Sequence, residues 1–265
     1  MKQDYKIATV GDNCMDVYDR TGKAYPGGNP VNVAVYTARL GGRASYTGVV
    51  GSDPYGDRMR AAIAAKGVDV SHLRTVPGAT AVSHVDIVGG DRVFGDYDEG
   101  VMANFRLTPE DIDFLCSHDL VVTGLWGHVE GDLQNFRARG IPVAFDFADK
   151  PDDPVVALAI PSVDYAFFSC DEGSEEDLHS FLRTMRTKGP KVVVATRGEL
   201  GSMAFDGSRF YPQGIVPCAV KDTMGAGDSF IAGFLYSLLR GGTLPECMAK
   251  GAENSSVTLQ YNGAW

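Results

Sequence analysis

The feature that most constrains the fold of this chain is the regular alternation of short β-branched runs with longer helical patterns. The runs have the length of strands, and the segments between them carry recognisable helix starts. Strands joined by crossover helices run parallel, so the sequence predicts a doubly wound α/β fold, with a mostly parallel sheet and helices on both faces. The expected strands are 6–10, 45–50, 119–123, 142–145, 163–168 and 191–196.

Four helix starts support this alternation. Asn29 and Asp53 each stand directly before a proline, the residue favoured at the first helical position. Thr108 and Ser174 each precede acidic residues of a first turn, which is the pattern of a capped helix start. We therefore expect a helix to begin at each of these four points.

One segment breaks the alternation. Residues 80–88 and 92–96 have apolar side chains at alternating positions and flank a Gly-Gly-Asp turn, which predicts a β-hairpin. With short strands inside residues 12–26 it would form a small separate sheet, a lid over about 12–26 and 80–98. An edge hairpin of the main sheet fits the pattern equally well. No linker separates two halves, so we expect one domain over 1–265.

Composition limits the classes of partner. The chain has 265 residues and a formal net charge of −10, so it has no electrostatic attraction to phosphate backbones or anionic lipid, and we expect neither nucleic acid nor a membrane. The apolar stretch at 230–239 is about half the length that crosses a bilayer, and the start carries no secretory pattern. The five cysteines are scattered without a Cys-x-x-Cys, which predicts a reducing cytoplasm.

The strongest chemical signal is the string DTMGAGD at 222–228, which follows a β-like run at 215–220 and precedes an apolar helical run. Glycines at a helix start leave backbone N–H groups free to bind a phosphate or a developing anion. Asp228, in the first turn, could accept a hydroxyl proton beside that anion hole. A capped helix behind a glycine turn is the structural alternative, but the whole string favours the functional interpretation.

A second string, GGNPVN at 27–32, combines two glycines that allow close approach of a ligand with a helix start. Asn32 lies in the first turn of that helix and can both donate to and accept from sugar hydroxyls. An ordinary helix start behind a glycine turn explains this string alone equally well.

Polar side chains also follow the first expected strand, at Asp12, Asn13 and Asp16. Ligands of open α/β sheets bind beyond the carboxyl ends of the strands, so these side chains are placed to meet one. The segment does not contain Gly-x-Gly-x-x-Gly, which argues against a dinucleotide-dependent dehydrogenase.

In their order and spacing, the strings at 27–32 and 222–228 resemble the two signatures of the ribokinase-like (PfkB) carbohydrate kinases, and the string TRGELG at 196–201 agrees. The resemblance covers essentially the whole chain and implies a kinase that uses ATP with Mg²⁺, in which Asp228 is the catalytic base. The anion hole would be formed by Gly225, Ala226 and Gly227. The sugar hydroxyls would be held by Asp16, Gly28 and Asn32. The nucleotide would be bound by Thr196, Arg197, Gly198, Gly201, Gly225, Gly227 and Asn254. The hairpin would be the family's lid, which implies a homodimer; its unpaired edges favour the same assembly.

Two departures from the family pattern concern metal ions. The Asn-x-x-Glu that the family links to magnesium and phosphate is Ser169-Cys-Asp-Glu172 here, so Glu172 remains as a metal ligand and Asp171 could add charge. The sequence stops at Trp265, where the family has further residues that help to bind a monovalent cation, so potassium dependence is left undecided.

Four segments narrow the substrate, because residues 91–105, 126–128, 145–150 and 260–265 resemble the bacterial fructoselysine 6-kinase branch of the family. The resemblance implies phosphorylation of the 6-hydroxyl of a sugar–amino acid adduct. Acids at 96, 98 and 99 suit an ammonium group, whereas Arg92 or His128 could meet a carboxylate. Asp12 and Trp126 complete the candidate substrate contacts, although Trp126 is equally suited to the core.

Other functions stay open at this point. The core signatures are shared by fructokinases and nucleoside kinases, because one fold supports many substrates. A catalytically inactive nucleotide-binding regulator would keep the fold, but the intact Asp228 and its glycine loop argue against it. Asp146 and Asp149 have the spacing of a phosphatase aspartate pair, without the full strand–loop context.

Overall fold

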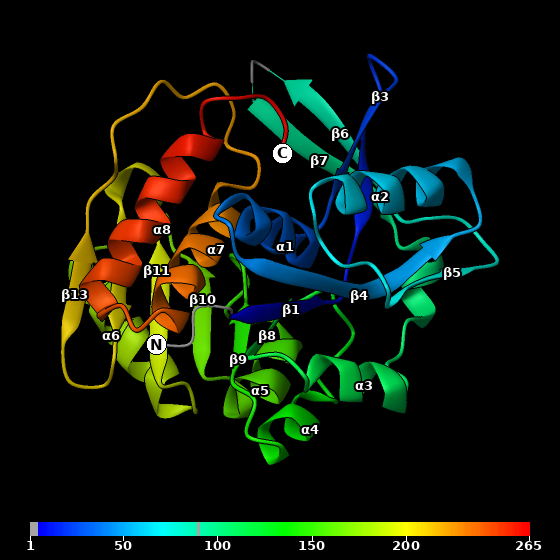
Figure 1. Ribbon diagram of the computed structural model, residues 1–265. Helices are drawn as coiled ribbons and strands as arrows, with labels where there is room; N and C mark the ends of the chain where they lie inside the picture. The colour runs from blue at the N-terminus through cyan, green and yellow to red at the C-terminus, as the bar shows by residue number, and fades with distance from the viewer. Residues whose placement is uncertain (1–4, 89–90) are drawn as a thin grey trace.

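The computed structural model describes residues 5–88 and 91–265 (Figure 1). Its main sheet runs through the centre of the molecule. Its strands are β1 (Lys6–Val10), β4 (Arg43–Gly51), β5 (Leu73–Val76), β8 (Leu120–Gly124), β9 (Val143–Asp146), β10 (Tyr165–Ser169), β11 (Val192–Thr196), β12 (Ser202–Phe205) and β13 (Phe210–Gln213). They lie in the order β13-β12-β11-β10-β9-β8-β1-β4-β5. The strands from β5 to β11 in this order are parallel, whereas β12 and β13 are antiparallel.

A separate small sheet is built from β2 (Cys14–Tyr18), β3 (Lys23–Gly27), β6 (Val82–Val88) and β7 (Asp91–Asp98), in the order β3-β2-β6-β7. It lies at the upper right of Figure 1, away from the plane of the main sheet. The predicted hairpin and the short strands near the N-terminus therefore pair with each other, and the alternative of an edge hairpin on the main sheet is excluded.

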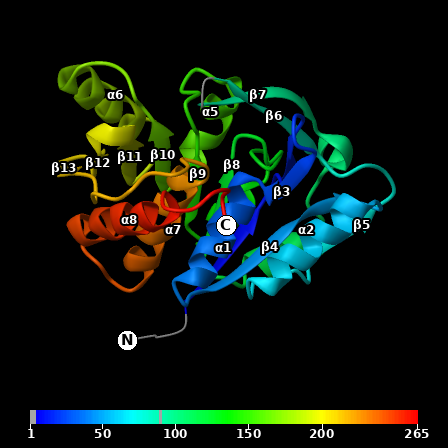
Figure 2. The same cartoon turned by 90° about the horizontal axis from the view of Figure 1, so that it is seen from above.

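Helices cover both faces of the main sheet (Figure 2). They are α1 (Asn29–Arg39), α2 (Pro54–Ala65), α3 (Pro109–Leu115), α4 (Leu133–Ala138), α5 (Pro154–Ala159), α6 (Glu175–Thr187), α7 (Ala226–Leu239) and α8 (Leu244–Thr258). The helices α3 to α6 bury Leu115, Phe136 and Leu182 on one face. On the other face, α1 and α7 bury Tyr36 and Phe234. The doubly wound architecture is confirmed, and burial on both faces explains why the central strands are almost continuously apolar.

The helix starts form as the capping pattern predicts. Thr108 and Ser174 each make a reciprocal capping box with the aspartate three residues later. The Asp53 carboxylate accepts a hydrogen bond from the Gly56 N–H at 2.8 Å. Asn29 is the first residue of α1, but its side chain does not cap the helix; it reaches into the site described below.

The structure corrects the sequence-based elements at several points. The expected strand at 215–220 is an irregular loop, because Pro217 has no N–H to donate and Ile215 and Val220 are more than half exposed instead of packing on a neighbouring strand. The short strands β5, β12 and β13 were not predicted. Within the described residues, no helix is both long and apolar enough to span a bilayer.

Candidate active site

The candidate site lies at the edge of the main sheet where the neighbouring parallel strands β1, β8, β9, β10 and β11 have their carboxyl ends. In a doubly wound sheet this edge is where ligands bind. The first turns of α1 and α7 come to the same edge, because Asn29 and Asn32 of α1 hydrogen-bond to Asp228 of α7. Residues about 200 positions apart in the chain therefore build one site.

The Asp228 carboxylate is held between two amides. Asn29 donates from Nδ2 to Asp228 Oδ1 at 2.6 Å, and Asn32 donates from Nδ2 to Asp228 Oδ2 at 2.7 Å. The Asn29 amide also donates to Asp146 Oδ2 at 2.8 Å, while its backbone N–H donates to Asp12 Oδ2 at 3.2 Å. Asn29 thus brings together carboxylates from the end of β1, the end of β9 and the start of α7.

Burial changes the proton affinity of these three acids. It raises the pKa of Asp228 to about 6, against the opposing effect of the Asn32 and Asn29 donors. The pKa values of Asp12 and Asp146 rise to about 7, because each is buried and faces the charge of Asp228. An aspartate with a pKa near neutrality is suited to receive a proton from a hydroxyl group.

The glycine loop before α7 has the backbone of an anion hole. Gly225 has a left-handed φ of 72°, and a Cβ atom there would overlap the Tyr36 hydroxyl, so only glycine fits. The Asp222 carboxylate holds the loop in place with two hydrogen bonds. Its Oδ1 accepts from the Met224 N–H at 2.9 Å, and its Oδ2 accepts from the Gly263 N–H at 2.7 Å. The first N–H groups of α7 then lie beside Asp228, at the positive end of the helix dipole.

The two glycines before α1 are required by close contacts. Gly28 has a φ of 111°, and a Cβ there would lie 2.7 Å from the Cα of Asn13. A Cβ on Gly27 would lie 2.7 Å from Oδ2 of Asp16, which places that buried carboxylate beside the entry to α1. The structure thus brings Asp16, Gly28 and Asn32 to the same end of α1.

Two loops after strand ends hold non-glycine residues in the left-handed region. His128 follows β8 with a φ of 55°, and Ala148 follows β9 with a φ of 49°. Such strain persists where the surrounding structure imposes it, and it occurs most often at functional sites. The His128 imidazole lies 3.6 Å from the Glu99 carboxylate, just after β7, so it joins this loop to the small sheet.

Of the remaining substrate-side residues, three have exposed side chains, and the side chain of the fourth is not described. Trp126 is 43% exposed, which excludes the interpretation that it is a core residue. Asp96 and Asp98 are exposed on β7. The side chain of Arg92 lies outside the described part of the structure.

The nucleotide-side residues gather where β10 and β11 end. The hydroxyls of Ser169 and Thr196 are 3.5 Å apart, on paired residues of the two strands. Arg197 donates to the Gly173 carbonyl at 3.1 Å, and Gly198, at a φ of 53°, has Asp171 Oδ1 3.6 Å from its Cβ position. Gly201 also has a positive φ, with the Gln213 carbonyl against its Cβ position.

Asp171 and Glu172 are exposed on the loop after β10. In the described residues no three His, Cys, Asp or Glu side chains converge as a metal cage. Exposed carboxylates of this kind fit Mg²⁺, which keeps several waters and takes one or two protein carboxylates together with nucleotide phosphates.

Asn254 is placed differently from the other candidate nucleotide residues. It is buried in α8, where its Nδ2 donates to the Ser229 carbonyl at 2.7 Å and its Oδ1 accepts from Arg39 at 2.8 Å. Its side chain is thus engaged in joining α1, α7 and α8.

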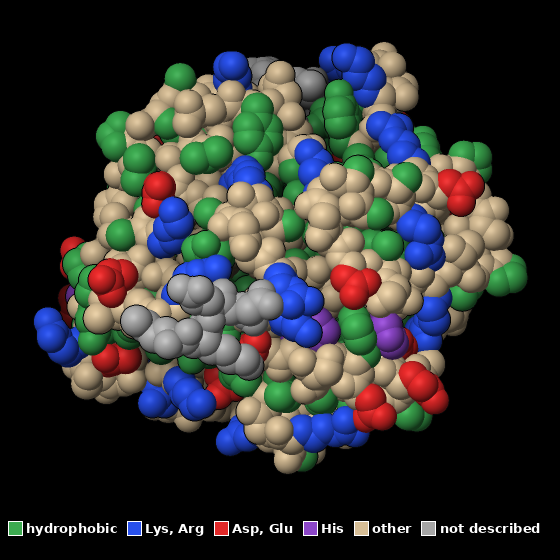
Figure 3. All heavy atoms as spheres, in the orientation of Figure 1, with side chains coloured by type: hydrophobic (Ala, Val, Ile, Leu, Met, Phe, Trp, Pro, Cys, Tyr) green, Lys and Arg blue, Asp and Glu red, His purple; other side chains and the backbone are tan. Residues whose placement is uncertain are grey.

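An exposed apolar surface borders the nucleotide side. The loop before α7 exposes Ile215 and Val220, and Leu200 and Val257 are also exposed. The Lys221 N–H donates to the Leu259 carbonyl at 2.8 Å, which holds this loop against the end of α8. Figure 3 shows hydrophobic side chains gathered over the region where the loop passes, on a face where charges of both signs are otherwise interspersed.

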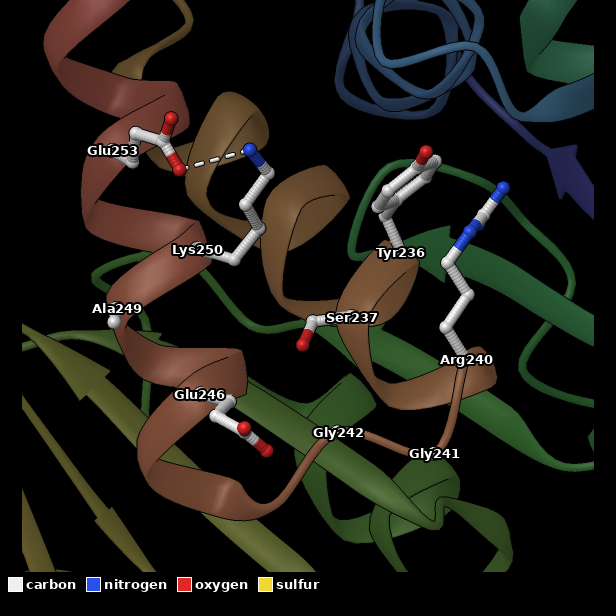
Figure 4. A pocket seen from close by; sticks show the side chains of 9 residues that line it. All are labelled: Tyr236, Ser237, Arg240, Gly241, Gly242, Glu246, Ala249, Lys250 and Glu253. Atoms are coloured by element: carbon white, nitrogen blue, oxygen red, sulfur yellow. Dashed lines mark hydrogen bonds and ion pairs between the residues drawn. The ribbon is translucent and has the colours of Figure 1, made fainter.

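A separate hollow of about 520 Å³ lies between the end of α7 and the α8 helix (Figure 4). Tyr236 and Arg240 line one side, and Lys250, paired with Glu253 at 2.8 Å, lines the other. Arg240 follows Asp228 by twelve residues, or about 18 Å along a helix. This hollow is therefore not part of the candidate site.

Sequence reasoning missed three side chains of the site. The sequence indicates Asn29 as a helix start within the string at 27–32, Asp146 as half of a phosphatase-like pair within the segment 145–150, and Trp265 as part of the segment 260–265, with no site role for any of the three side chains. The position of Asp146 at a strand end was an available signal, since β9 lies beside β8 at the binding edge. The contact of the Trp265 indole with Asn32 at 2.7 Å had no signal in the sequence.

Comparisons with known proteins identify the family of the chain. A model of the "pfkB family carbohydrate kinase" matches residues 4–265. The chain is 46% identical to the fructoselysine 6-kinase of Shigella flexneri over 98% of this chain and 99% of that protein. It is 45% identical, with the same coverage, to the fructoselysine 6-kinase of Escherichia coli K12. Its identity to the fructosamine kinase FrlD of Bacillus subtilis is 35%, over 98% of this chain and 93% of that protein.

Solved structures support the fold. The Arabidopsis thaliana ribokinase complexed with ribose and ATP superposes with a TM-score of 0.90 at 22% identity, covering 98% of this chain and 94% of that one. The adenosine kinase of Sinorhizobium meliloti superposes with a TM-score of 0.84 at 24% identity, covering 98% and 95%. The architecture is therefore ribokinase-like.

Proposed function

Because the chain belongs to the pfkB family of carbohydrate kinases, we propose that it transfers the γ-phosphate of ATP to the 6-hydroxyl of fructoselysine. The observation that carries the chemistry is the half-buried Asp228, held by two amide donors beside the glycine loop at the start of α7. The observation that favours this substrate is the 45–46% identity to two fructoselysine 6-kinases along nearly the full chain.

The reaction requires a proton acceptor and a site for the charge of the transferred group. The acceptor oxygen attacks the γ-phosphorus in line, its proton passes to Asp228, and the bond between the γ-phosphorus and the ADP oxygen breaks. Asn29 and Asn32 donate to the carboxylate and so favour its ionised, proton-accepting form. The N–H groups of Gly225 and Gly227 stabilise the charge on the phosphoryl oxygens; the Ala226 N–H is bonded to the Thr223 carbonyl.

The two substrates approach from different sides of Asp228. ATP would lie along Thr196, Arg197, Gly198 and Gly201, with its base against the exposed apolar surface of Ile215, Val220, Leu200 and Val257. Glu172 and Asp171 would hold a Mg²⁺ ion, which neutralises phosphate charge when it is bound with the nucleotide.

The sugar side would use the polar groups near α1 and the small sheet. Asp12, Asp16, Gly28 and Asn32 would hold the hydroxyls of the fructosyl part. The amino-acid part brings an ammonium group and a carboxylate: Asp98 and Glu99 suit the former, His128 and Arg92 suit the latter, and Trp126 offers an exposed ring. We also propose that the chain acts as one domain, in the cytoplasm.

A coupled assay of ADP release tests the activity and the substrate together. We expect fructoselysine to exceed free fructose by on the order of 10²–10⁴ in kcat/KM, since two charge-assisted hydrogen bonds are added. Ribose and adenosine complete the panel. A kcat/KM for fructose within a few-fold of that for fructoselysine would overturn the substrate assignment but leave the kinase assignment in place. A preference for adenosine would make the chain a nucleoside kinase.

The catalytic base is tested by Asp228→Asn, which keeps the volume and removes the proton acceptor. We expect kcat to fall by on the order of 10²–10⁴, with the circular dichroism spectrum and the ATP dissociation constant retained. Turnover near the parent value would show that another group accepts the proton.

A further inference from the structure

The Asn32 side chain connects Asp228 to an indole group. Trp265 Nε1 donates to Asn32 Oδ1 at 2.7 Å, and Asn32 Nδ2 donates to Asp228 Oδ2 at 2.7 Å. Asn32 is 4% exposed, so water does not compete freely for either end of its amide. The three side chains form a chain of hydrogen bonds that runs from the indole to the carboxylate.

The direction of this chain is set by chemistry. An indole N–H can only donate, whereas an asparagine amide has a donor end and an acceptor end of nearly the same shape. If the Asn32 amide turned over, its NH₂ group would face the indole N–H, and its oxygen would face the carboxylate. Trp265 therefore holds Asn32 in the one orientation that offers a donor to Asp228.

Trp265 is itself fixed by the segment that precedes it. The Gly263 N–H is bound by Asp222, at the start of the glycine loop, and the Ala264 carbonyl accepts from the Tyr36 and Tyr261 hydroxyls. The Lys66 ammonium lies 5.6 Å from the centre of the Trp265 ring. The indole is therefore positioned by the glycine loop before α7 and by α1. It supports the geometry of the same two elements.

We propose that Trp265 is a positioning residue for proton transfer, which fixes the amide of Asn32 so that Asp228 stays ionised and aimed at the acceptor hydroxyl. The proposal rests on the assignment of Asp228 as the base. The other titratable groups that face Asp228 are Asp12 after β1, Asp146 at the end of β9 and the Tyr36 hydroxyl on α1. None of these three contacts the indole N–H.

A magnetic resonance experiment tests the hydrogen-bond chain without any substrate. The chain has two tryptophans, so the indole region of a ¹H–¹⁵N spectrum holds two signals, and Trp126 serves as the exposed internal reference. We expect the Trp265 indole proton to be shifted downfield, to exchange slowly, and to titrate as Asp228 gains its proton. Asp228→Asn should abolish the titration. A Trp265 indole that exchanges as fast as that of Trp126, or that does not titrate, would overturn the proposal even if the chain proved inactive on fructoselysine.

The kinetic test compares Trp265→Phe, which removes the donor and keeps a ring, with Lys66→Met, which removes the cation beside the ring and keeps the donor. Without the indole donor, the Asn32 amide is free to turn and withdraw its Nδ2 from Asp228. Loss of a donor raises the pKa of a carboxylate. In the profile of kcat against pH, the acid limb is the fall of kcat at low pH. We expect this limb to move up by about one pH unit in Trp265→Phe, which is equivalent to roughly a tenfold loss of kcat at pH values well below the limb. At pH 8.5, kcat should stay within about threefold, and the KM for ATP should not change. Lys66→Met should leave the limb in place.

A merely structural role would give a different result. It would lower the thermal midpoint of Trp265→Phe and reduce kcat by the same factor at every pH, or would move the limb equally in Lys66→Met. Either outcome would overturn the proposal, as would an unchanged pH profile.

Discussion

Asn29 holds three carboxylates at one point, and this contact decides how the site responds to pH. Its amide nitrogen bridges Asp146 and Asp228, and its backbone N–H binds Asp12. Buried carboxylates this close to one another cannot all ionise easily, so their protons are released in steps that belong to the group rather than to one residue. Activity should therefore fall as pH drops through about 6, where Asp228 takes up its proton.

Replacement of Asp146 by asparagine should separate these effects. Asp146, with a pKa of about 7, already holds its proton where Asp228 titrates near pH 6, and the variant keeps a carbonyl oxygen for Asn29, so we expect the acid limb of kcat to stay in place. The measurement is kcat against pH for the parent and Asp146→Asn. An acid limb that moves to lower pH in Asp146→Asn would show instead that Asp146 is ionised when Asp228 takes up its proton.

The same variant should change how stability depends on pH. The pKa of Asp146 is raised from 3.8 to about 7 in the folded protein, so the folded state holds this proton more tightly than the unfolded chain. The contribution to stability is complete below pH 3.8 and is lost as pH rises through about 7. We expect Asp146→Asn to unfold at higher urea concentration than the parent at pH 8, and to show a smaller advantage at pH 5, which lies between the two pKa values. An advantage of equal size at both pH values would contradict the assignment.

At the scale of elements, the start of α7 depends on a contact with α1. Gly225 lies in the left-handed region against the Tyr36 hydroxyl, whereas nothing lies within 4 Å of a Cβ built on Gly227. Two glycines of one motif thus have different structural requirements, although both are expected to provide N–H groups to the phosphoryl oxygens. The difference follows from the packing of α7 on α1.

Alanine at each position tests this difference. Gly225→Ala should lose on the order of 1–3 kcal/mol of stability, because the new methyl group must displace Tyr36 and occupy a strained backbone. Gly227→Ala should be neutral or more stable by about 0.5–1 kcal/mol, since it adds helix propensity inside the first turn. Urea unfolding of both variants measures the gap. Equal losses would mean that the contact with Tyr36 is not what restricts Gly225.

The sequence allowed the fold to be predicted where local patterns decide it. The capped helix starts and the β-branched runs are local signals, and strand β1 forms at the residues expected. The loop at 215–220 was misjudged because its apolar residues are typical of a strand, and only the tertiary structure shows that Ile215 and Val220 have no strand beside them. For the same reason, Asp228 could be predicted from its own motif, whereas its contacts with Asn29 and the indole contact of Asn32 join distant segments and could not.

At the scale of the whole molecule, the small sheet leaves aromatic side chains exposed. Tyr25 on β3 is 38% exposed and Tyr97 on β7 is 40% exposed, and Tyr18 packs edge-on against Tyr25 at 5.6 Å. The sheet also ends in edge strands, β3 and β7, which natural proteins usually cover. We propose that a second copy of the chain covers this sheet, so that the protein is a homodimer.

Light scattering at micromolar concentrations should then give twice the mass of one chain. Tyr25→Glu places a charge in the proposed interface and should shift the protein toward the monomer. Leu158→Glu, at a side chain that is 66% exposed on α5, is the matched control and should remain a dimer. A parent protein that is monomeric throughout this range would remove the dimer from the proposal.

The long separation between partners in the site also has a consequence for how the protein is made. During synthesis, Asn29 can contact Asp228 only after 199 further residues have been added, and Asn32 can contact Trp265 only after 233 further residues. At ribosomal speeds of about 5–20 residues per second, this delay lasts roughly ten seconds to under a minute. A nascent chain can pair β1 with β4 early, but it holds two amides that face no base. The contacts that hold the base of the reaction can therefore form only after α7 has been synthesised and has packed on α1.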